Sequence, residues 1–132
     1  THPATGYGYI RPGEAIGESA RAVAAYVEKP DAATAAQYLL DGYFWNSGNF
    51  IFHAATMKAE LEAFAPDIVG PVGEAVAKAR ADLDFLVLDA AAFGRAKKIS
   101  IDYAVMERTK KAAVLPGHFG WSDVGGWAAV WD

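Results

Sequence analysis

The chain contains no cysteine among its 132 residues, so disulfide bonds, thiolate metal ligands and a cysteine nucleophile are excluded. Such a composition is compatible with a reducing compartment, and we expect a cytoplasmic location. No apolar stretch approaches the roughly 20 residues that span a bilayer. The N-terminal segment, residues 1–5, has neither the basic nor the apolar part of a signal peptide. We therefore expect no membrane partner.

Long basic runs are also missing, and the longest are the pairs Lys97-Lys98 and Lys110-Lys111. With a net charge of −4, the chain is not expected to bind nucleic acid through a broad positive surface. An anionic ligand would have to be held by local groups. The three histidines, His2, His53 and His118, lie too far apart for metal-ligand spacing, and we expect His53 to be a packed or turn residue.

Strand-like and helix-like segments alternate along the chain, which predicts the α/β class and one domain with a real core. Residues 85–88 fit either a short strand or the start of a helix. We expect a turn at 11–13 followed by a loop to residue 20, and a helix that opens at Pro71. The other expected strands are 5–10, 22–27, 50–52 and 112–115. The other expected helices are 32–40, one that carries Met57, Leu61, Phe64 and Ile68 and is interrupted by Pro66, one capped by Ser100, and a last helix from near Trp127.

A carboxylate and an ammonium, Glu28 and Lys29, stand where the apolar run 22–27 meets Pro30. Proline ends the strand and biases the residue before it toward extended geometry, so we expect both charged residues to be extended at a strand end. One interpretation is that Glu28 accepts hydrogen bonds from sugar hydroxyls while Lys29 faces a phosphate. The alternative is an exposed charged turn.

Two further stretches also allow both a ligand-binding interpretation and a purely structural one. Glycines alternate with tyrosines in Gly6-Tyr7-Gly8-Tyr9, which fits either close approach of a ligand or a weakened edge strand. The polar run Asn46-Ser47-Gly48-Asn49 fits either amides directed at a ligand or a turn that satisfies its own backbone.

Together and in order, five motifs resemble the sugar-1-phosphate nucleotidyltransferases, most closely the bacterial mannose-1-phosphate guanylyltransferases. The motifs are Thr5-Gly6-Tyr7-Gly8-Tyr9-Ile10, Val27-Glu28-Lys29-Pro30, Trp45-Asn46-Ser47-Gly48-Asn49-Phe50, Ser100-Ile101-Asp102-Tyr103-Ala104-Val105-Met106-Glu107 and Gly120-Trp121-Ser122-Asp123-Val124-Gly125. The resemblance implies a partial Rossmann-like nucleotide-diphospho-sugar transferase fold, with flanking helices on a mixed sheet.

The resemblance also implies a reaction and its site. Mannose 1-phosphate would attack the α-phosphorus of GTP, giving GDP-mannose and pyrophosphate. Lys29 and Asp123 would be catalytic, and Asp123 would ligate Mg²⁺, which prefers oxygen ligands. Positioning and charge neutralisation are the main requirements of such a transfer. The implied substrate-binding residues are Gly8, Glu28, Lys29, Asn46, Ser47 and Asn49.

Parts of the family pattern are missing. The glycine-rich nucleotide-binding loop and a second metal-binding aspartate are not found, and Gly126 stands where serine is expected. We therefore expect residues 1–132 to be the C-terminal, sugar-phosphate-binding part of the catalytic domain, inactive alone, with GTP bound by an absent N-terminal part. Open strand edges would then favour a homo-oligomer. The alternatives are a non-catalytic sugar-phosphate-binding or interaction module, and part of a glucose-1-phosphate uridylyl- or thymidylyltransferase.

Overall fold

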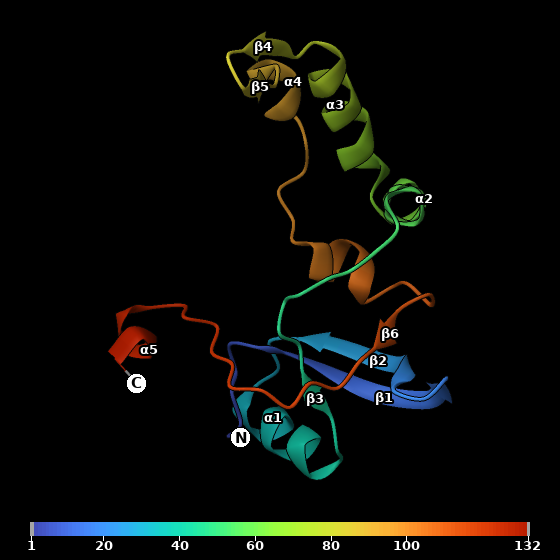
Figure 1. Cartoon of the computed structure of the whole chain (residues 1–132), viewed down its shortest axis with the longest axis vertical. Coiled ribbons are helices and arrows are strands. Elements are labelled where there is room, and N and C mark those ends of the chain that lie inside the picture. The colour runs from blue at the N-terminus through green and yellow to red at the C-terminus, as the bar shows by residue number, and fades with distance from the viewer. Residues whose placement is uncertain (1, 132) are drawn as a thin grey trace. The chain divides into compact units, whose positions relative to one another are not determined.

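The computed structural model describes residues 2–131, which divide into two compact units (Figure 1). The first unit comprises Thr1–Phe50 with Lys110–Asp132, and the second comprises Ile51–Thr109. Each unit is described by itself. Among the described residues, no helix is both long and apolar enough to cross a membrane.

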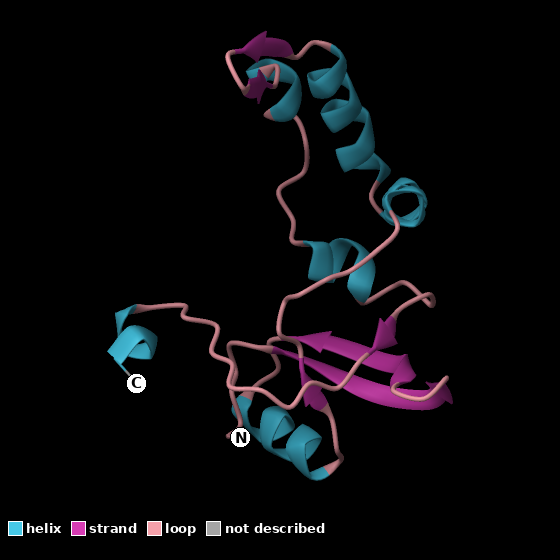
Figure 2. Cartoon of the chain, in the orientation of Figure 1, coloured by secondary structure: helices cyan, strands magenta, loops and turns pink. Residues whose placement is uncertain are grey.

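A four-stranded sheet forms the centre of the first unit (Figure 2). Its strands are β1 (Gly8–Ile16), β2 (Ala20–Glu28), β3 (Phe44–Trp45) and β6 (Ala113–Val114), in the order β3-β1-β2-β6. The pairings among these described strands are all antiparallel, so the mixed sheet expected from the sequence is not seen among them. Strand β6 lies near the predicted position, ahead of Pro116.

Strand β1 continues through Arg11-Pro12-Gly13, so the turn predicted there and the loop predicted after it are wrong. Proline has no N–H to donate, and Pro12 is accommodated because the ladder is irregular on both sides of it. Arg11 pairs with Ala25, Pro12 with Val23 and Ala15 with Arg21. The two one-residue shifts therefore cancel. The chain turns instead near Gly17, which has a φ of 72°.

Helix α1 (Ala32–Leu40) was predicted with its correct bounds. Asp31 caps it by accepting a 2.8 Å hydrogen bond from the N–H of Thr34, and this bond lowers the pKa of the Asp31 carboxyl. Gly42, with a φ of 77°, follows the helix end as predicted. Ala35 is the buried residue of this helix.

Aromatic rings join helix α1 to the sheet. Tyr38 packs against Tyr9 of β1 and stacks on Tyr43 at a centroid distance of 4.1 Å. Tyr9 is fully buried, and its hydroxyl donates to the carbonyl of Ala4 and accepts from the indole N–H of Trp45. These contacts fix β1 and β3 on one side of the site described below. The chain's last described element is α5 (Trp127–Trp131), which begins where the sequence predicted.

The second unit is mainly helical, with α2 (Ala54–Phe64), α3 (Pro66–Ala77), α4 (Ala90–Phe93) and a π-helical turn η1 (Asp102–Met106). Pro66, not Pro71, opens the second helix, because a first-turn proline loses no intrahelical bond; Pro71 lies inside α3. Ala65, Ala104 and Val105 form the core of this unit. The turn η1 occupies the place predicted for the Ser100 helix, but it has no side-chain cap.

The structure decides two apolar stretches, of which the sequence left the first open and predicted the second as a strand. Phe85–Val87 is strand β5, paired with β4 (Arg80–Asp82) in a short hairpin. Residues 50–52 do not form the predicted strand, and Ile51 is fully exposed. A strand needs a neighbour to satisfy its backbone groups, and among the described residues this segment has none.

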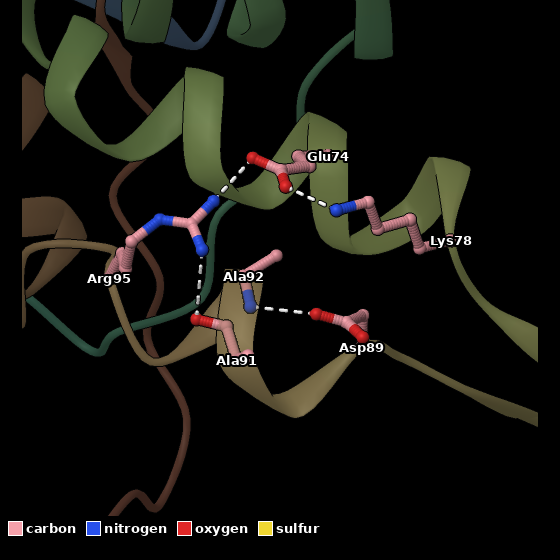
Figure 3. A network of polar contacts seen from close by, with 6 residues as sticks. All are labelled: Glu74, Lys78, Asp89, Ala91, Ala92 and Arg95. Carbon is pink, nitrogen blue, oxygen red and sulfur yellow. Dashed lines mark hydrogen bonds and ion pairs between the residues drawn. The ribbon is translucent and has the colours of Figure 1, made fainter.

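Glu74 joins α3 to α4 through a polar network (Figure 3). It pairs with Lys78 on its own helix and with Arg95, whose guanidinium also donates to the carbonyl of Ala91. These partners, with Lys78 first and Arg95 next, lower the pKa of Glu74, and Glu74 in turn raises the pKa of Lys78. These ion pairs and the hydrogen bond to Ala91 stabilise the surface of the second unit.

Candidate functional site

A row of three residues crosses three neighbouring strands at one end of the first unit's sheet. Gly8 on β1 pairs directly with Glu28 on β2, and its carbonyl accepts a 2.8 Å hydrogen bond from the N–H of Asn46, just after β3. Gly8 therefore lies between the carboxylate and the amide. A methyl group on Gly8 would lie 2.7 Å from Oε2 of Glu28 and 3.2 Å from Cβ of Asn46. Glycine is needed here, because the side chains of Glu28 and Asn46 come too close to its backbone to leave room for a Cβ.

Tyr26 completes this row, and our sequence interpretation missed it. Its side chain is buried, and its hydroxyl accepts a 2.5 Å hydrogen bond from Nδ2 of Asn46. It would also lie 3.4 Å from a methyl group on Gly8. Tyr26 lies two residues before Glu28, so strand alternation places both on the same face. The two-residue spacing between Tyr26 and Glu28 is the sequence signal from which Tyr26 could have been identified.

Lys29 lies beside Glu28 and faces solvent. Its Nζ is 2.8 Å from Oε1 of Glu28, with the lysine side chain 57% exposed and the glutamate side chain only 8% exposed. The structure thus offers a nearly buried carboxylate with a solvent-facing cation beside it. Long lysine side chains can keep the charge in water while the carboxylate stays packed.

The backbone of Lys29 differs from the prediction. We expected an extended residue before Pro30, but Lys29 has a φ of 49°, in the left-handed region. Its N–H still donates to the carbonyl of Tyr7 at 3.3 Å, so the ladder closes at this residue. A proline disfavours the right-handed helical region for its predecessor, and the chain here turns by the left-handed one instead. Strain of about 1–3 kcal/mol is typical of such a conformation.

The polar turn after β3 satisfies much of its own hydrogen bonding. Oδ1 of Asn46 accepts from the N–H of Gly48 at 3.0 Å, and Nδ2 of Asn49 donates to Oγ of Ser47 at 3.1 Å. These bonds fit the alternative of a self-satisfied turn. Asn46 nevertheless belongs to the row, whereas ligand-binding roles for Ser47 and Asn49 stay predictions.

Aromatic rings bring the last motif toward the same strand end. Tyr7, next to Gly8, contacts Trp45 at a centroid distance of 5.1 Å and Trp121 at 5.2 Å, both edge-on. A cleft of about 300 Å³ lies beside these rings. It is lined by Tyr43, Phe44, Trp45, Ser47, Val114, Leu115, Pro116, Gly117, Phe119 and Trp121. Trp121 was predicted only as part of a motif, and its ring contact now ties the 120–125 loop to Tyr7, the residue before β1.

Asp123 follows Trp121 by two residues and is exposed. The structure brings together Gly8, Glu28, Lys29 and Asn46. Within the described part of the chain, no hydrogen bond or ion pair joins the Asp123 carboxylate to Glu28 or Lys29, and the role of Asp123 stays a prediction. Among the described residues, no group of three or more acidic, histidine or cysteine side chains could hold a metal ion. A single exposed carboxylate still suits Mg²⁺, which takes one or two protein carboxylates together with waters and phosphates.

This geometry suits a small ligand with hydroxyls and an anionic group. The carboxylate of Glu28 accepts hydrogen bonds only, and the amide of Asn46 can donate and accept. Lys29 supplies a local positive charge beside Glu28, although the net charge of the chain is −4. The arrangement can therefore hold a polyhydroxylated phosphate by local contacts.

Comparison with known proteins identifies the family. The family model described as Nucleotidyl transferase matches residues 1–132. The chain belongs to the nucleotidyl transferase family. This confirms the family that the five motifs predicted.

The relatives of this nucleotidyl transferase chain include bacterial mannose-1-phosphate guanylyltransferases and a xanthan biosynthesis protein. A mannose-1-phosphate guanylyltransferase of Salmonella typhimurium strain LT2 is 50% identical over the whole chain, which covers 28% of that protein. The mannose-1-phosphate guanylyltransferase of Sinorhizobium fredii is 51% identical over 99% of the chain, which covers 26% of it. A xanthan biosynthesis protein of Xanthomonas campestris is 48% identical over the whole chain, which covers 28% of it. The chain thus spans less than a third of the length of these relatives.

Solved structures confirm the α/β fold class. The mannose-1-phosphate geranyltransferase of Thermus thermophilus matches 98% of the chain with a TM-score of 0.81 and 38% identity, and 36% of that protein is covered. The mannose-6-phosphate isomerase of Helicobacter pylori matches 87% of the chain with a TM-score of 0.75 and 26% identity, and 45% of it is covered.

Proposed function

We propose that this chain is the sugar-phosphate-binding part of a mannose-1-phosphate guanylyltransferase, which converts mannose 1-phosphate and GTP into GDP-mannose and pyrophosphate. The observation that carries the proposal is the row Glu28–Gly8–Asn46 with Lys29 at its rim. The relatives that are about half identical over the whole chain bear that name. Xanthan biosynthesis in one relative supports a role in polysaccharide formation, and we propose a cytoplasmic location.

Each residue of the row has a distinct part in binding. Glu28 accepts hydrogen bonds from sugar hydroxyls, and its nearly buried position fixes the carboxylate for that purpose. Gly8 lets the sugar ring approach the backbone, and Asn46 contacts the opposite edge of the sugar. Lys29 turns from Glu28 toward the phosphate of the sugar, where it neutralises charge during the transfer. Ser47 and Asn49 contribute further polar groups from the turn.

Asp123 would hold Mg²⁺ through one carboxylate, with waters and ligand phosphates completing the coordination. When bound, the ion neutralises charge on the reacting phosphates. We propose that GTP binds to an N-terminal part of the catalytic domain outside this chain, and that the second metal-binding aspartate lies there too. The 132-residue chain alone should therefore bind mannose 1-phosphate without transferring nucleotide.

Calorimetric titration of mannose 1-phosphate into the chain tests the binding site directly. Lys29→Ala removes a charge-assisted contact, for which a loss of about 10- to 100-fold in affinity is typical. Lys97→Ala is the matched control, because Lys97 is similarly exposed, at 59% against 57%, and also faces a carboxylate, that of Asp67. No binding by the unmutated chain, or equal binding by Lys29→Ala, would refute the proposed site.

Two further measurements separate the substrate alternatives. Titration with glucose 1-phosphate tests the uridylyl- or thymidylyltransferase alternative, and tighter binding of this sugar than of mannose 1-phosphate would favour it. Pyrophosphate release from GTP and mannose 1-phosphate by the chain alone would overturn the proposal that the nucleotide site lies elsewhere. Asp123→Ala should weaken any Mg²⁺-dependent gain in affinity while leaving metal-free binding unchanged.

A further inference from the structure

The β4–β5 hairpin of the second unit exposes an unusual amount of apolar surface. Leu83 is 94% exposed, Phe85 74% and Leu86 64%. Leu83 also has a φ of 51°, a conformation that costs a bulky residue free energy. A two-stranded hairpin is marginally stable alone, and it is stabilised when further strands join it. These properties are typical of a surface that binds a partner.

The outer edge of β4 has no strand beside it in the described part of the chain. Asp82 pairs with Phe85 across the two-residue turn, so this closing pair directs its backbone groups toward β5. Alternation then directs the N–H and C=O of Ala81 away from β5, toward the free edge. Ala81 can thus form two hydrogen bonds with another strand without disturbing the hairpin.

The sequence of β4 is complementary to itself. Arg80 and Asp82 lie on one face of the strand, 3.2 Å apart and both exposed. If two copies of β4 pair antiparallel about a two-fold axis at Ala81, Arg80 faces Asp82 of the second copy and Asp82 faces Arg80 of the second copy. Opposite charges directly across a strand pair are attractive. Strand β5 has no charged residue and offers no such match.

The same pairing also gathers apolar side chains. Ala81 is opposite Leu86 within the hairpin, so the two lie on one face. Joining two copies at β4 places Leu86, Ala81, and the same residues of the second copy in one continuous strip across four strands. A two-fold interface of this kind uses the same surface on both partners, as closed homodimers require.

We propose that a second copy of this chain binds along the free edge of β4, in the register that pairs Ala81 with itself. The proposal concerns the second unit alone and does not depend on the sugar-phosphate site. It gives the predicted homo-oligomer a defined surface. The sheet formed by the two copies has the strand order β5-β4-β4-β5, with two symmetry-related ion pairs between the β4 strands.

Sedimentation velocity across a concentration series tests the proposal with charge reversals. Arg80→Asp turns both symmetric pairs into repulsive ones, and Asp82→Arg does the same with the opposite sign. Each should weaken dimerisation by about ten-fold or more. The double variant Arg80→Asp with Asp82→Arg exchanges the two charges and should restore the dimer. Ala81→Pro removes the outward N–H and places ring carbons at the free edge, without removing a hydrogen bond of the hairpin, and should also weaken dimerisation.

Lys58→Asp is the matched control, because Lys58 on α2 has the same 68% exposure as Arg80 and also pairs with an exposed carboxylate. It changes the net charge equally and should leave dimerisation unchanged. Circular dichroism verifies that each variant is folded. A monomer throughout the series, a dimer insensitive to both single reversals, or failure of the folded double variant to recover would overturn the proposal.

Discussion

Replacing Gly8 with alanine should damage the candidate site by one methyl group. That methyl would lie 2.7 Å from Oε2 of Glu28, closer than side-chain contacts normally come, and 3.2 Å from Cβ of Asn46. A flexible carboxylate could move aside at an exposed site. Here the Glu28 side chain is only 8% exposed and is paired with Lys29, so its movement breaks an existing contact.

The size of the effect follows from this crowding. Overpacking a well-filled site costs about 1–3 kcal/mol, and we expect Gly8→Ala to lower the free energy of unfolding of the first unit by that amount. The methyl would also push Glu28 and Asn46 away from the positions in which they are proposed to contact the sugar. Affinity for mannose 1-phosphate should therefore fall more than stability alone explains.

Urea unfolding followed by tryptophan fluorescence is a suitable assay, because all four tryptophans (45, 121, 127 and 131) belong to the first unit. Gly6→Ala is the matched control. A methyl group there would meet nothing within 4 Å, and Gly6 lies only two residues from Gly8. We expect that control to unfold within about 0.5 kcal/mol of the unmutated chain. If Gly8→Ala unfolds and binds like Gly6→Ala, the close packing of Glu28 and Asn46 on Gly8 does not form the binding site.

Three other changes test parts of the fold and site. Tyr26→Phe removes the hydroxyl that holds Asn46 and should destabilise the first unit by about 1 kcal/mol while weakening sugar-phosphate binding; unchanged calorimetric affinity would contradict a positioning role for Tyr26. Asp31→Asn keeps a cap for the N–H of Thr34 but removes the titrating carboxyl. The pKa of Asp31 is lower in the folded chain than its value of about 3.8 in the unfolded chain. The charged carboxylate therefore stabilises the fold above about pH 3.8, and this contribution is lost as the pH falls through the folded pKa. The urea midpoint of the variant should therefore vary less with acid pH than that of the unmutated chain. Leu83→Gly relieves the positive φ and should stabilise the second unit by about 1 kcal/mol in circular dichroism melts, and an equal loss instead would show that the leucine side chain is needed there.

Local chemistry explains which elements the sequence could predict. Asp31 and Gly42 bound α1 because a cap and a left-handed glycine are decided by neighbouring residues. The strand end at Glu28 was predictable for the same reason, since Pro30 follows it closely. The family assignment came from five motifs in order and was confirmed over the whole chain.

The errors arose where distant pairing decides the structure. Pro12 signals a turn locally, yet it lies within β1 because two ladder irregularities accommodate it. Residues 50–52 have strand composition but no neighbouring strand in the described part of the chain. At the site, the motifs identified Glu28 and Asn46 separately. Their convergence on Gly8 depends on strand register, which a single segment does not specify.

The cancelling irregularities around Pro12 make the candidate site sensitive to chain length as well as to residue type. Removing one residue from β2 between Ala22 and Ala25 would leave the shift in β1 uncompensated. If the turn at Gly17 kept its pairing, Glu28 would then no longer stand opposite Gly8. Removing one residue from each strand would restore that match. Insertions and deletions in this hairpin should therefore be tolerated in pairs, one in each strand, even though none of the deleted residues belongs to the row at Gly8.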